Sequence, residues 1–300
     1  SGEVHWMRHM IDAHEARAMA SGARLVHACG FDSIPSDLGC LFLQQRAIER
    51  YGRPCSSVKL FVRRMQGTFS GGTVASMLNA LEAARRSPED RRIMGNPYAL
   101  NPAGERSGPD GSDQARPLRD PDADGWTAPF VMAAVNTRIV RRSHALLGWP
   151  WGRRFRYAES VITGDGVAGL ARATALTAGL AGFMAAASVG PARAVMNRLF
   201  LPQPGQGPDE AAREAGGFEM LLVGRHPAAP RRHIQARVTG RRDPGYGATA
   251  RMLGEAAMCL ALDGDRLPVA GGFWTPATAF GARLIGRLAQ HADIRFTIDV

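Results

Sequence analysis

The chain has 300 residues, of which 45% are hydrophobic and 21% charged, so it can bury a core across two domains. This balance excludes wholesale disorder and collagen-like repeats. The formal net charge is +10, but Lys59 is the only lysine and the arginines are scattered in pairs, a pattern that argues against nucleic acid as a partner.

The first elements are typical of a βα unit. Residues 4–20 repeat apolar side chains at helical spacing, which predicts an amphipathic helix that ends at Ser21-Gly22. Residues 24–29 form an apolar run that predicts a strand, 30–37 are rich in turn formers, and 38–51 resume a helical pattern. Helix, strand, loop and helix in this order indicate an α/β domain.

The middle of the chain mixes further strands and helices with one long polar segment. The expected order is a strand, a glycine loop, a helix, a long loop rich in Pro, Gly, Asp and Arg, a strand, a helix and a strand. Their ranges are 58–65, 66–73, 74–86, 101–128, 130–136, 137–147 and 154–163.

Residues 167–189 form the most apolar stretch, with Arg172 as its only charge. The stretch is long enough to span a bilayer. Its composition is mostly Ala, Gly and Thr with few Leu or Ile, which favours a buried or interface-packed helix over a membrane span. A location at a membrane surface stays open.

The last third predicts a linker, a pair of antiparallel strands, two helices and a final strand. Thr275 followed by Pro276 is typical of a helix N-terminus and opens the second of these helices. The ranges are 202–208, 218–223 with 233–240, 246–262, 275–290 and 294–298.

The segment 30–37 is the first candidate site, because loops at the carboxyl ends of strands direct polar groups into one crevice. Gly30 permits close backbone approach, Asp32 is expected to point into the crevice, and Ser36 or Asp37 is expected to cap the next helix. The alternative is that Asp32 and Asp37 are ordinary turn and cap residues.

A second candidate site is the glycine segment Ser70-Gly71-Gly72-Thr73. Free amides at the start of the following helix could hold a carboxylate, a phosphate or a thioester oxygen. The alternative is a simple helix cap.

Two other patterns carry less chemistry. Residues 164–169 match G-x-G-x-x-G, but no acidic residue follows at the distance that ribose binding requires, which favours a glycine-rich helix start. The four cysteines form no CxxC pair and have no metal-ligand spacing, which is typical of reduced thiols in a cytoplasmic protein and predicts no metal site. They are Cys29, Cys40, Cys55 and Cys259.

Several blocks together resemble the saccharopine dehydrogenase-like oxidoreductases, in the branch that contains trans-acting enoyl reductases. The blocks are Gly2-Glu3 and residues 27–39, 70–77, 243–250 and 271–277. Saccharopine reductases proper carry Gly-x-Asp-Pro-Gly where this chain has Gly30-Phe31-Asp32-Ser33-Ile34, so the resemblance does not imply an amino-acid substrate.

The resemblance implies an α/β fold with an incomplete, doubly wound Rossmann-type domain and a second α+β substrate domain that contains the apolar helical segment. The expected boundaries are 1–55, 56–243 and 244–300, the last segment returning to the first domain. Family members begin with a strand and a glycine-rich phosphate loop that this chain lacks. The resemblance therefore implies a chain without the N-terminal part of its cofactor domain, which leaves open whether the chain alone is active.

The implied activity is an NAD- or NADP-dependent reduction of a double bond on a lipid or polyketide intermediate. The implied partner is a small or lipid-like substrate, and a homodimer stays open. Asp32 is expected at the reaction centre. The nicotinamide is expected beside Gly2, Glu3, Gly30 and Phe31, and the substrate beside Ser70, Gly71, Gly72 and Thr73. The alternative is a truncated, non-catalytic member that binds a lipid surface or a partner.

Overall fold

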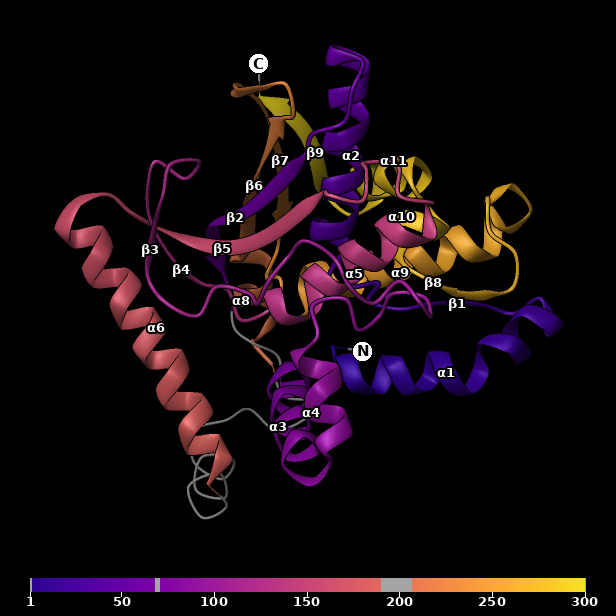
Figure 1. The fold of residues 1–300 in the computed structure, drawn as a ribbon, viewed down its shortest axis with the longest axis horizontal. Coiled ribbons are helices and arrows are strands. Elements are labelled where there is room, and N and C mark those ends of the chain that lie inside the picture. The colour runs from indigo at the N-terminus through magenta and orange to yellow at the C-terminus, as the bar shows by residue number, and fades with distance from the viewer. Residues whose placement is uncertain (1, 68–70, 190–206, 300) are drawn as a thin grey trace.

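The computed structural model describes residues 2–67, 71–189 and 207–299, and Figure 1 shows its elements. The helices are α1 (Val4–Ser21), α2 (Ile34–Tyr51), α3 (Gly71–Arg86), α4 (Pro88–Gly95), α5 (Ala133–Leu146), α6 (Gly166–Ser188), α8 (Glu210–Ala215), α9 (Gly247–Leu262), α10 (Pro276–Ala279) and α11 (Ala282–His291). The strands are β1 (Arg24–Val26), β2 (Ser57–Gln66), β3 (Leu118–Asp120), β4 (Gly125–Pro129), β5 (Arg156–Gly164), β6 (Gly217–His226), β7 (Ala229–Arg241), β8 (Gly272–Trp274) and β9 (Ile294–Asp299). A 3-10 turn, η1, covers Gly264–Arg266.

The fold is α/β, built on a mixed seven-stranded sheet with the order β3-β4-β5-β2-β6-β7-β9. Strands β2 and β5 are parallel, whereas every other neighbouring pair in this sheet is antiparallel. A second, parallel pair joins β1 to β8, which brings a segment of the first thirty residues beside one of the last thirty.

Helix α2 packs across the large sheet and forms the centre of the main core. It contacts β6, β7 and β9 on one side and α5 and α10 on the other. A side chain at Gly39 would meet Leu222 and Val238 at 3.1–3.3 Å, so the glycine lets the helix approach the sheet closely. Burial of each large apolar side chain in this core stabilises the fold by about 1.5–3 kcal/mol.

Most of the predicted elements are confirmed, with ends that differ by a few residues. They include the helices at 4–20, 74–86 and 246–262, the strands at 58–65, 154–163 and 294–298, and the antiparallel pair at 218–223 and 233–240. In each of these segments the apolar positions repeat regularly over the whole length, so the local pattern was sufficient to predict the element.

Two predictions in the middle of the chain are wrong. The strand expected at 130–136 does not form, because β4 ends at Pro129 and helix α5 begins at Ala133. The segment 101–128 is not a single loop, since β3 lies within it and pairs in antiparallel fashion with β4. Near the start of the chain, the strand expected at 24–29 does form, but it ends at Val26, and Ala28 has a left-handed backbone with φ 58°.

Two helix boundaries also differ. Helix α2 begins at Ile34 rather than 38, with Pro35 in its first turn, where the missing amide hydrogen has no cost. The helix expected at 275–290 is divided into α10 and α11, because Gly281 adopts φ 53°.

The helix expected at 167–189 forms as α6. Of the two alternatives predicted for it, a buried or an interface-packed helix, burial is wrong within the described residues. Its buried residues are Gly169, Ala173 and Ala187. Among the described helices it alone is long and apolar enough to cross a membrane, and 11% of its most apolar window is buried. The predicted linker at 202–208 falls mostly outside the described residues, and the domain boundaries stay predictions.

Candidate functional site

The loop after β1 is conformationally strained. Ala28 and Ser33 adopt φ values of 58° and 90°, a left-handed backbone that costs a non-glycine residue about 1–2 kcal/mol. Such strain persists where surrounding contacts hold it, and it is concentrated at functional sites. Here the Phe31 amide donates to Thr249 Oγ1 at 3.1 Å, and Ser33 Oγ donates to Asn136 Oδ1 at 3.0 Å.

This loop borders a cavity of about 340 Å³, here called the Asp32 cavity. Five segments that are distant in sequence meet around it: the start of the chain, the loop after β1, the end of β2 with the first turns of α3, the residue before α5, and the start of α9. The lining residues are Gly2, Ala28, Cys29, Gly30, Phe31, Asp32, Met65, Gly67, Gly72, Thr73, Ser76, Met132, Pro244, Gly245, Thr249 and Leu253.

Asp32 is the acidic side chain of this lining. Burial raises the pKa of its carboxyl above the ordinary value. A side chain at Gly2 would lie 3.2 Å from Asp32 Oδ2, so the backbone of Gly2 passes directly beside the carboxyl. The positive charge of the N-terminal amino group lowers the pKa of the same carboxyl by a smaller amount.

Glycines allow the walls of the cavity to come close together. A side chain at Gly30 would meet Thr249 Cγ2 at 3.0 Å, and one at Gly67 would meet Asp243 Oδ1 at 2.7 Å. Asp243 in turn accepts hydrogen bonds from the amides of Gly245, Tyr246 and Gly247 at 2.9–3.0 Å, which fixes the turn that enters α9. These glycines therefore let the loop after β1 and the end of β2 lie close to the segment that enters α9.

Most of the predicted site residues are brought together here. Gly2, Gly30, Phe31, Asp32, Gly72 and Thr73 line the Asp32 cavity. Gly71 begins α3 without lining it, Ser70 lies outside the described residues, and Glu3 precedes α1 with its Oε2 4.0 Å from His5 Nε2. The roles expected for all of these residues stay predictions.

Sequence reasoning missed the wall contributed by the start of α9. Thr249 lies in the block 243–250 that carried the family resemblance, so that block was the available signal. Four other lining residues had no such signal in the sequence, because a lone apolar or small polar side chain does not indicate which cavity it faces. They are Met65, Ser76, Met132 and Leu253.

The expected role of Asp37 and Ser36 as helix caps is wrong, since both lie inside α2 and are buried. Asp37 accepts hydrogen bonds from Ser143 Oγ and from the Ala277 amide, the latter at 2.8 Å. Burial raises the pKa of Asp37 to about 7. The residue therefore connects α2 to α5 and α10 and does not line the Asp32 cavity.

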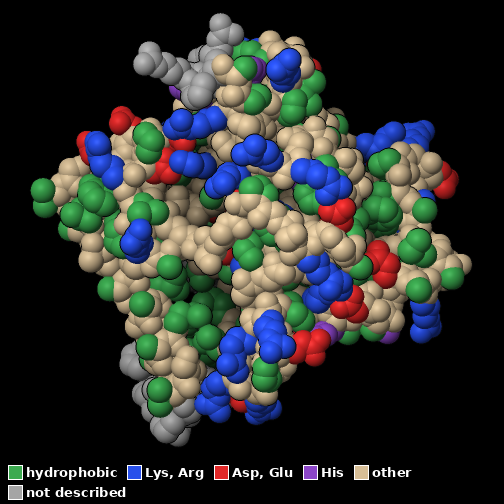
Figure 2. All heavy atoms as spheres, viewed as in Figure 1, with side chains coloured by type: hydrophobic (Ala, Val, Ile, Leu, Met, Phe, Trp, Pro, Cys, Tyr) green, Lys and Arg blue, Asp and Glu red, His purple; other side chains and the backbone are tan. Residues whose placement is uncertain are grey.

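A second cavity of about 460 Å³, here called the apolar cavity, adjoins the first. Both are bordered by Gly2, Asp32, Thr73, Ser76 and Met132. Its other walls come from α3, α4, α5 and α6. Figure 2 shows hydrophobic side chains gathered in a hollow on this side of the molecule.

The comparisons with known proteins agree on one family. No protein-family model matches the chain, and no solved structure is significantly similar to it. A Mycobacterium tuberculosis protein whose name includes trans-acting enoyl reductase is 42% identical over 302 residues, which cover 96% of this chain and 70% of the relative. The trans-acting enoyl reductases of Mycobacterium bovis and Mycobacterium ulcerans are 37% and 36% identical over 96% and 97% of this chain and 70% and 71% of their own lengths. The chain therefore belongs to the trans-acting enoyl reductase family.

Proposed function

We propose that the chain reduces the activated carbon–carbon double bond of a lipid or polyketide thioester with a hydride from NADH or NADPH, as a saccharopine dehydrogenase-like oxidoreductase with a Rossmann-type cofactor domain. One observation carries the proposal. The Asp32 cavity gathers a buried carboxyl with a raised pKa, glycine walls and the first turn of α3 in one place.

The Asp32 cavity fits the nicotinamide end of such a cofactor. Its glycine walls leave room for a flat ring, and its volume lies at the small end of the range of about 300–1,000 Å³ typical of ligand pockets. The described lining contains no Lys or Arg to pair with a diphosphate. We therefore propose that the diphosphate and adenine bind on residues that do not line this cavity.

The chemistry that the bound nicotinamide supplies is a hydride for the β-carbon of the substrate. Negative charge then develops on the thioester oxygen, and protonation of the α-carbon completes the reduction. Because its pKa is raised, the Asp32 carboxyl holds a proton more readily than an ordinary aspartate and can donate a hydrogen bond to that oxygen. The positive end of the α3 dipole favours the same charge.

A titration tests the cofactor assignment. We expect the chain to bind both reduced nicotinamide mononucleotide and NADPH, measured by tryptophan fluorescence, because the nicotinamide half that they share contacts this cavity. NADPH should have the lower Kd, since its diphosphate and adenine gain contacts outside the cavity, and equal Kd values would contradict those outside contacts. Absence of binding by both nucleotides would overturn the cofactor assignment.

Asp32→Ala tests the catalytic role, because alanine removes the hydrogen-bond donor, whereas asparagine would keep one on its amide nitrogen. Loss of a hydrogen-bond donor to a developing oxyanion typically lowers kcat by about 10²–10³. We expect a reduction of this order for crotonyl-pantetheine and NADPH. Any fall in the wild-type rate that ionisation of Asp32 causes as pH rises should be absent from the variant. The matched control is Asp265→Ala, which removes an exposed carboxylate on η1. Unchanged kcat in Asp32→Ala would remove Asp32 from the mechanism.

The exposed surface of α6 favours a second candidate function, a non-catalytic module that binds a lipid surface. Val167 and Leu176 are 85% and 52% exposed although the helix is strongly apolar. Under both candidate functions we propose a cytoplasmic protein that can contact a membrane surface. Vesicle binding without nucleotide binding would favour the second function over the first.

A further inference from the structure

The apolar cavity extends the Asp32 cavity away from the reaction centre. Beyond the five shared residues, its lining is almost wholly aliphatic or aromatic. The apolar side chains come from the start of α1, from α3, α4, α5 and α6, and from the segment before α5: Val4, Met77, Ala80, Leu81, Ala84, Met94, Pro129, Phe130, Val131, Ala134, Val135, Leu180 and Met184.

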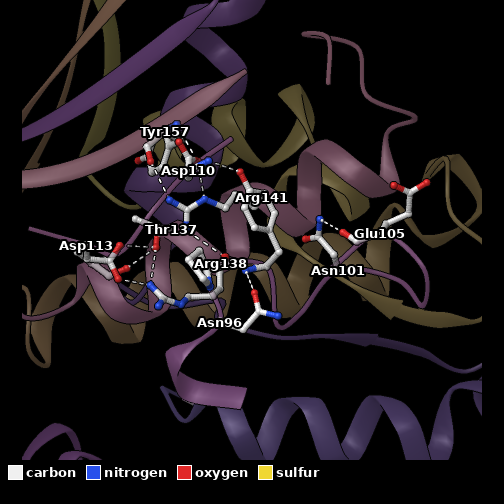
Figure 3. A network of polar contacts seen from close by, with 12 residues as sticks. Asn96, Asn101, Glu105, Asp110, Asp113, Thr137, Arg138, Arg141 and Tyr157 are labelled. Carbon is white, nitrogen blue, oxygen red and sulfur yellow. Dashed lines mark hydrogen bonds and ion pairs between the residues drawn. The ribbon is translucent and has the colours of Figure 1, made fainter. Parts of the chain in front are cut away.

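The polar side chains beyond the shared residues already have partners within the protein. Asp113 pairs with Arg138 and accepts from Thr137 Oγ1 at 3.0 Å, a network that Figure 3 shows. Gln114 donates to the carbonyl oxygens of Arg116 and Thr127 at 2.9 and 3.0 Å.

Arg91, the third of these polar side chains, is exposed and donates through Nε to the Ala84 carbonyl oxygen at 3.0 Å. A ligand in the apolar cavity is therefore offered hydrocarbon contact and few new hydrogen bonds. Under these conditions an apolar chain binds well, whereas a polar one loses its hydration without compensation.

Helix α6 forms the outer wall of the apolar cavity. Phe183 and Ala187, near its end, pack against Leu78 and Leu81 of α3. Leu180 and Met184, on neighbouring turns, line the apolar cavity. This contact explains how a helix that is mostly exposed can still enclose a hydrophobic space.

We propose that the apolar cavity binds the acyl chain of an acyl thioester whose reacting end lies beside Asp32. The inference rests on the proposed function and deepens it, because it assigns a long acyl group as the substrate class. Five residues line both cavities, Asp32 among them, so the two adjoin at the carboxyl and a chain whose carbonyl lies at Asp32 has the hydrophobic space directly beside it.

Calorimetric titration with two probes tests this subsite in the full chain. We expect dodecanoyl-pantetheine to bind at least about tenfold more tightly than butanoyl-pantetheine, the equivalent of about 1.4 kcal/mol, because the longer chain buries additional methylene groups. In Ala80→Trp the indole fills part of the cavity, and the preference should fall below about threefold. Equal binding of the two probes to the unaltered chain would overturn the proposal.

The matched control is Asn79→Trp, which adds the same ring one residue earlier on α3 at an exposed position outside the lining. It should keep the preference, and its loss in this variant too would overturn the assignment. If Ala80→Trp does not fold, Ala134→Trp replaces it, since Ala134 is an exposed lining residue on α5.

Nucleotide titration of the same samples separates the two proposals. Nucleotide binding without a chain-length preference would refute the acyl subsite and leave the reductase function standing. A preference that Ala80→Trp abolishes, in a chain that binds no nucleotide, would support the subsite and refute the reductase function.

Discussion

Asp37 and Glu159 are buried carboxyl groups that form no ion pair with a described residue. Glu159 of β5 accepts hydrogen bonds from Tyr157 Oη at 2.8 Å and from Asn136 Nδ2 at 2.9 Å. Asp37 is held by Ser143 and by the Ala277 amide. Burial raises the pKa of each carboxyl to about 7, so both hold a proton in the folded state over a range where the unfolded chain releases it.

Asp37→Asn should therefore change stability in a pH-dependent way. Between the ordinary value of 3.8 and about 7, the folded wild type binds more protons than the unfolded chain at this site, so its contribution to the free energy of unfolding falls as pH rises. We expect the substitution to cost less stability at about pH 8 than at about pH 5, measured by urea unfolding of both proteins.

The free energies of unfolding of variant and wild type must be compared at each pH, because other titrating groups change this free energy in the opposite direction as pH rises. Burial lowers the pKa of His27 and His144 to about 4, so their contribution to stability increases as pH rises. These histidines are present in both proteins and cancel in the difference. A cost that is equal at the two pH values, or larger at the higher one, would contradict the raised pKa of Asp37.

At the scale of elements, buried arginines of α5 fix the segment before β3. Arg141 pairs with Asp110 at 2.7 Å and donates to the carbonyl oxygens of Tyr157 and Pro97 at 2.9 and 3.0 Å (Figure 3). Arg138 holds Asp113 in the same way. The polar composition of this segment therefore reflects partners in the core rather than solvent exposure alone.

Arg141→Met should release this segment. The change leaves Asp110 desolvated without its cation, and loss of one partner of a buried pair costs about 3–5 kcal/mol. We expect a corresponding fall in the free energy of unfolding and faster proteolysis within 101–117. The control is Arg153→Met, which removes an exposed pair with Glu105 and should leave the unfolding midpoint unchanged. Equal effects of the two substitutions would contradict this role.

Two glycines of α6 have opposite expected effects on substitution. A side chain at Gly169 would overlap the carbonyl oxygen of Gly164, so Gly169→Ala should destabilise the attachment of α6 to β4 and β5 by about 1–3 kcal/mol. Gly179 has open space around it, and Gly179→Ala should stabilise the helix by up to about 1 kcal/mol. Denaturant unfolding measures the change in the free energy of unfolding in each variant. A change of the same sign in the two variants would contradict this packing.

At the scale of the whole molecule, a basic chain carries an apolar helix on its surface. The net charge is +10, and Leu176 of α6 is 52% exposed. Hydrophobic insertion and attraction to anionic headgroups act together at a membrane surface. Figure 1 shows α6 at the periphery of the fold, where it packs on β4 and β5 of the large sheet.

Vesicle flotation should detect this association. We expect the protein to float with phosphatidylglycerol vesicles more than with phosphatidylcholine vesicles, and Leu176→Glu to reduce binding by about tenfold through loss of an inserted side chain. Leu262→Glu, at a 66% exposed position at the end of α9, should have little effect. Equal losses of vesicle binding in Leu176→Glu and Leu262→Glu would mean that the net charge of the protein, and not the exposed surface of α6, determines the binding.

The sequence by itself determined the α/β class, most of the elements and part of the lining around Asp32. Local periodicity is sufficient for an element whose apolar positions repeat over several turns, and this holds for α1, α9 and the β6–β7 pair. The family resemblance marked the loop after β1 and the first turn of α3, which the fold places on one cavity.

Only the tertiary structure decided what each of these segments faces. Asp32 and Asp37 lie five residues apart in the same turn-rich stretch, yet one lines a cavity and the other is buried between three helices. The apolar pattern of α6 is equally compatible with a buried helix and an exposed one. Burial depends on which distant segments pack against a residue, and a local pattern does not contain that information.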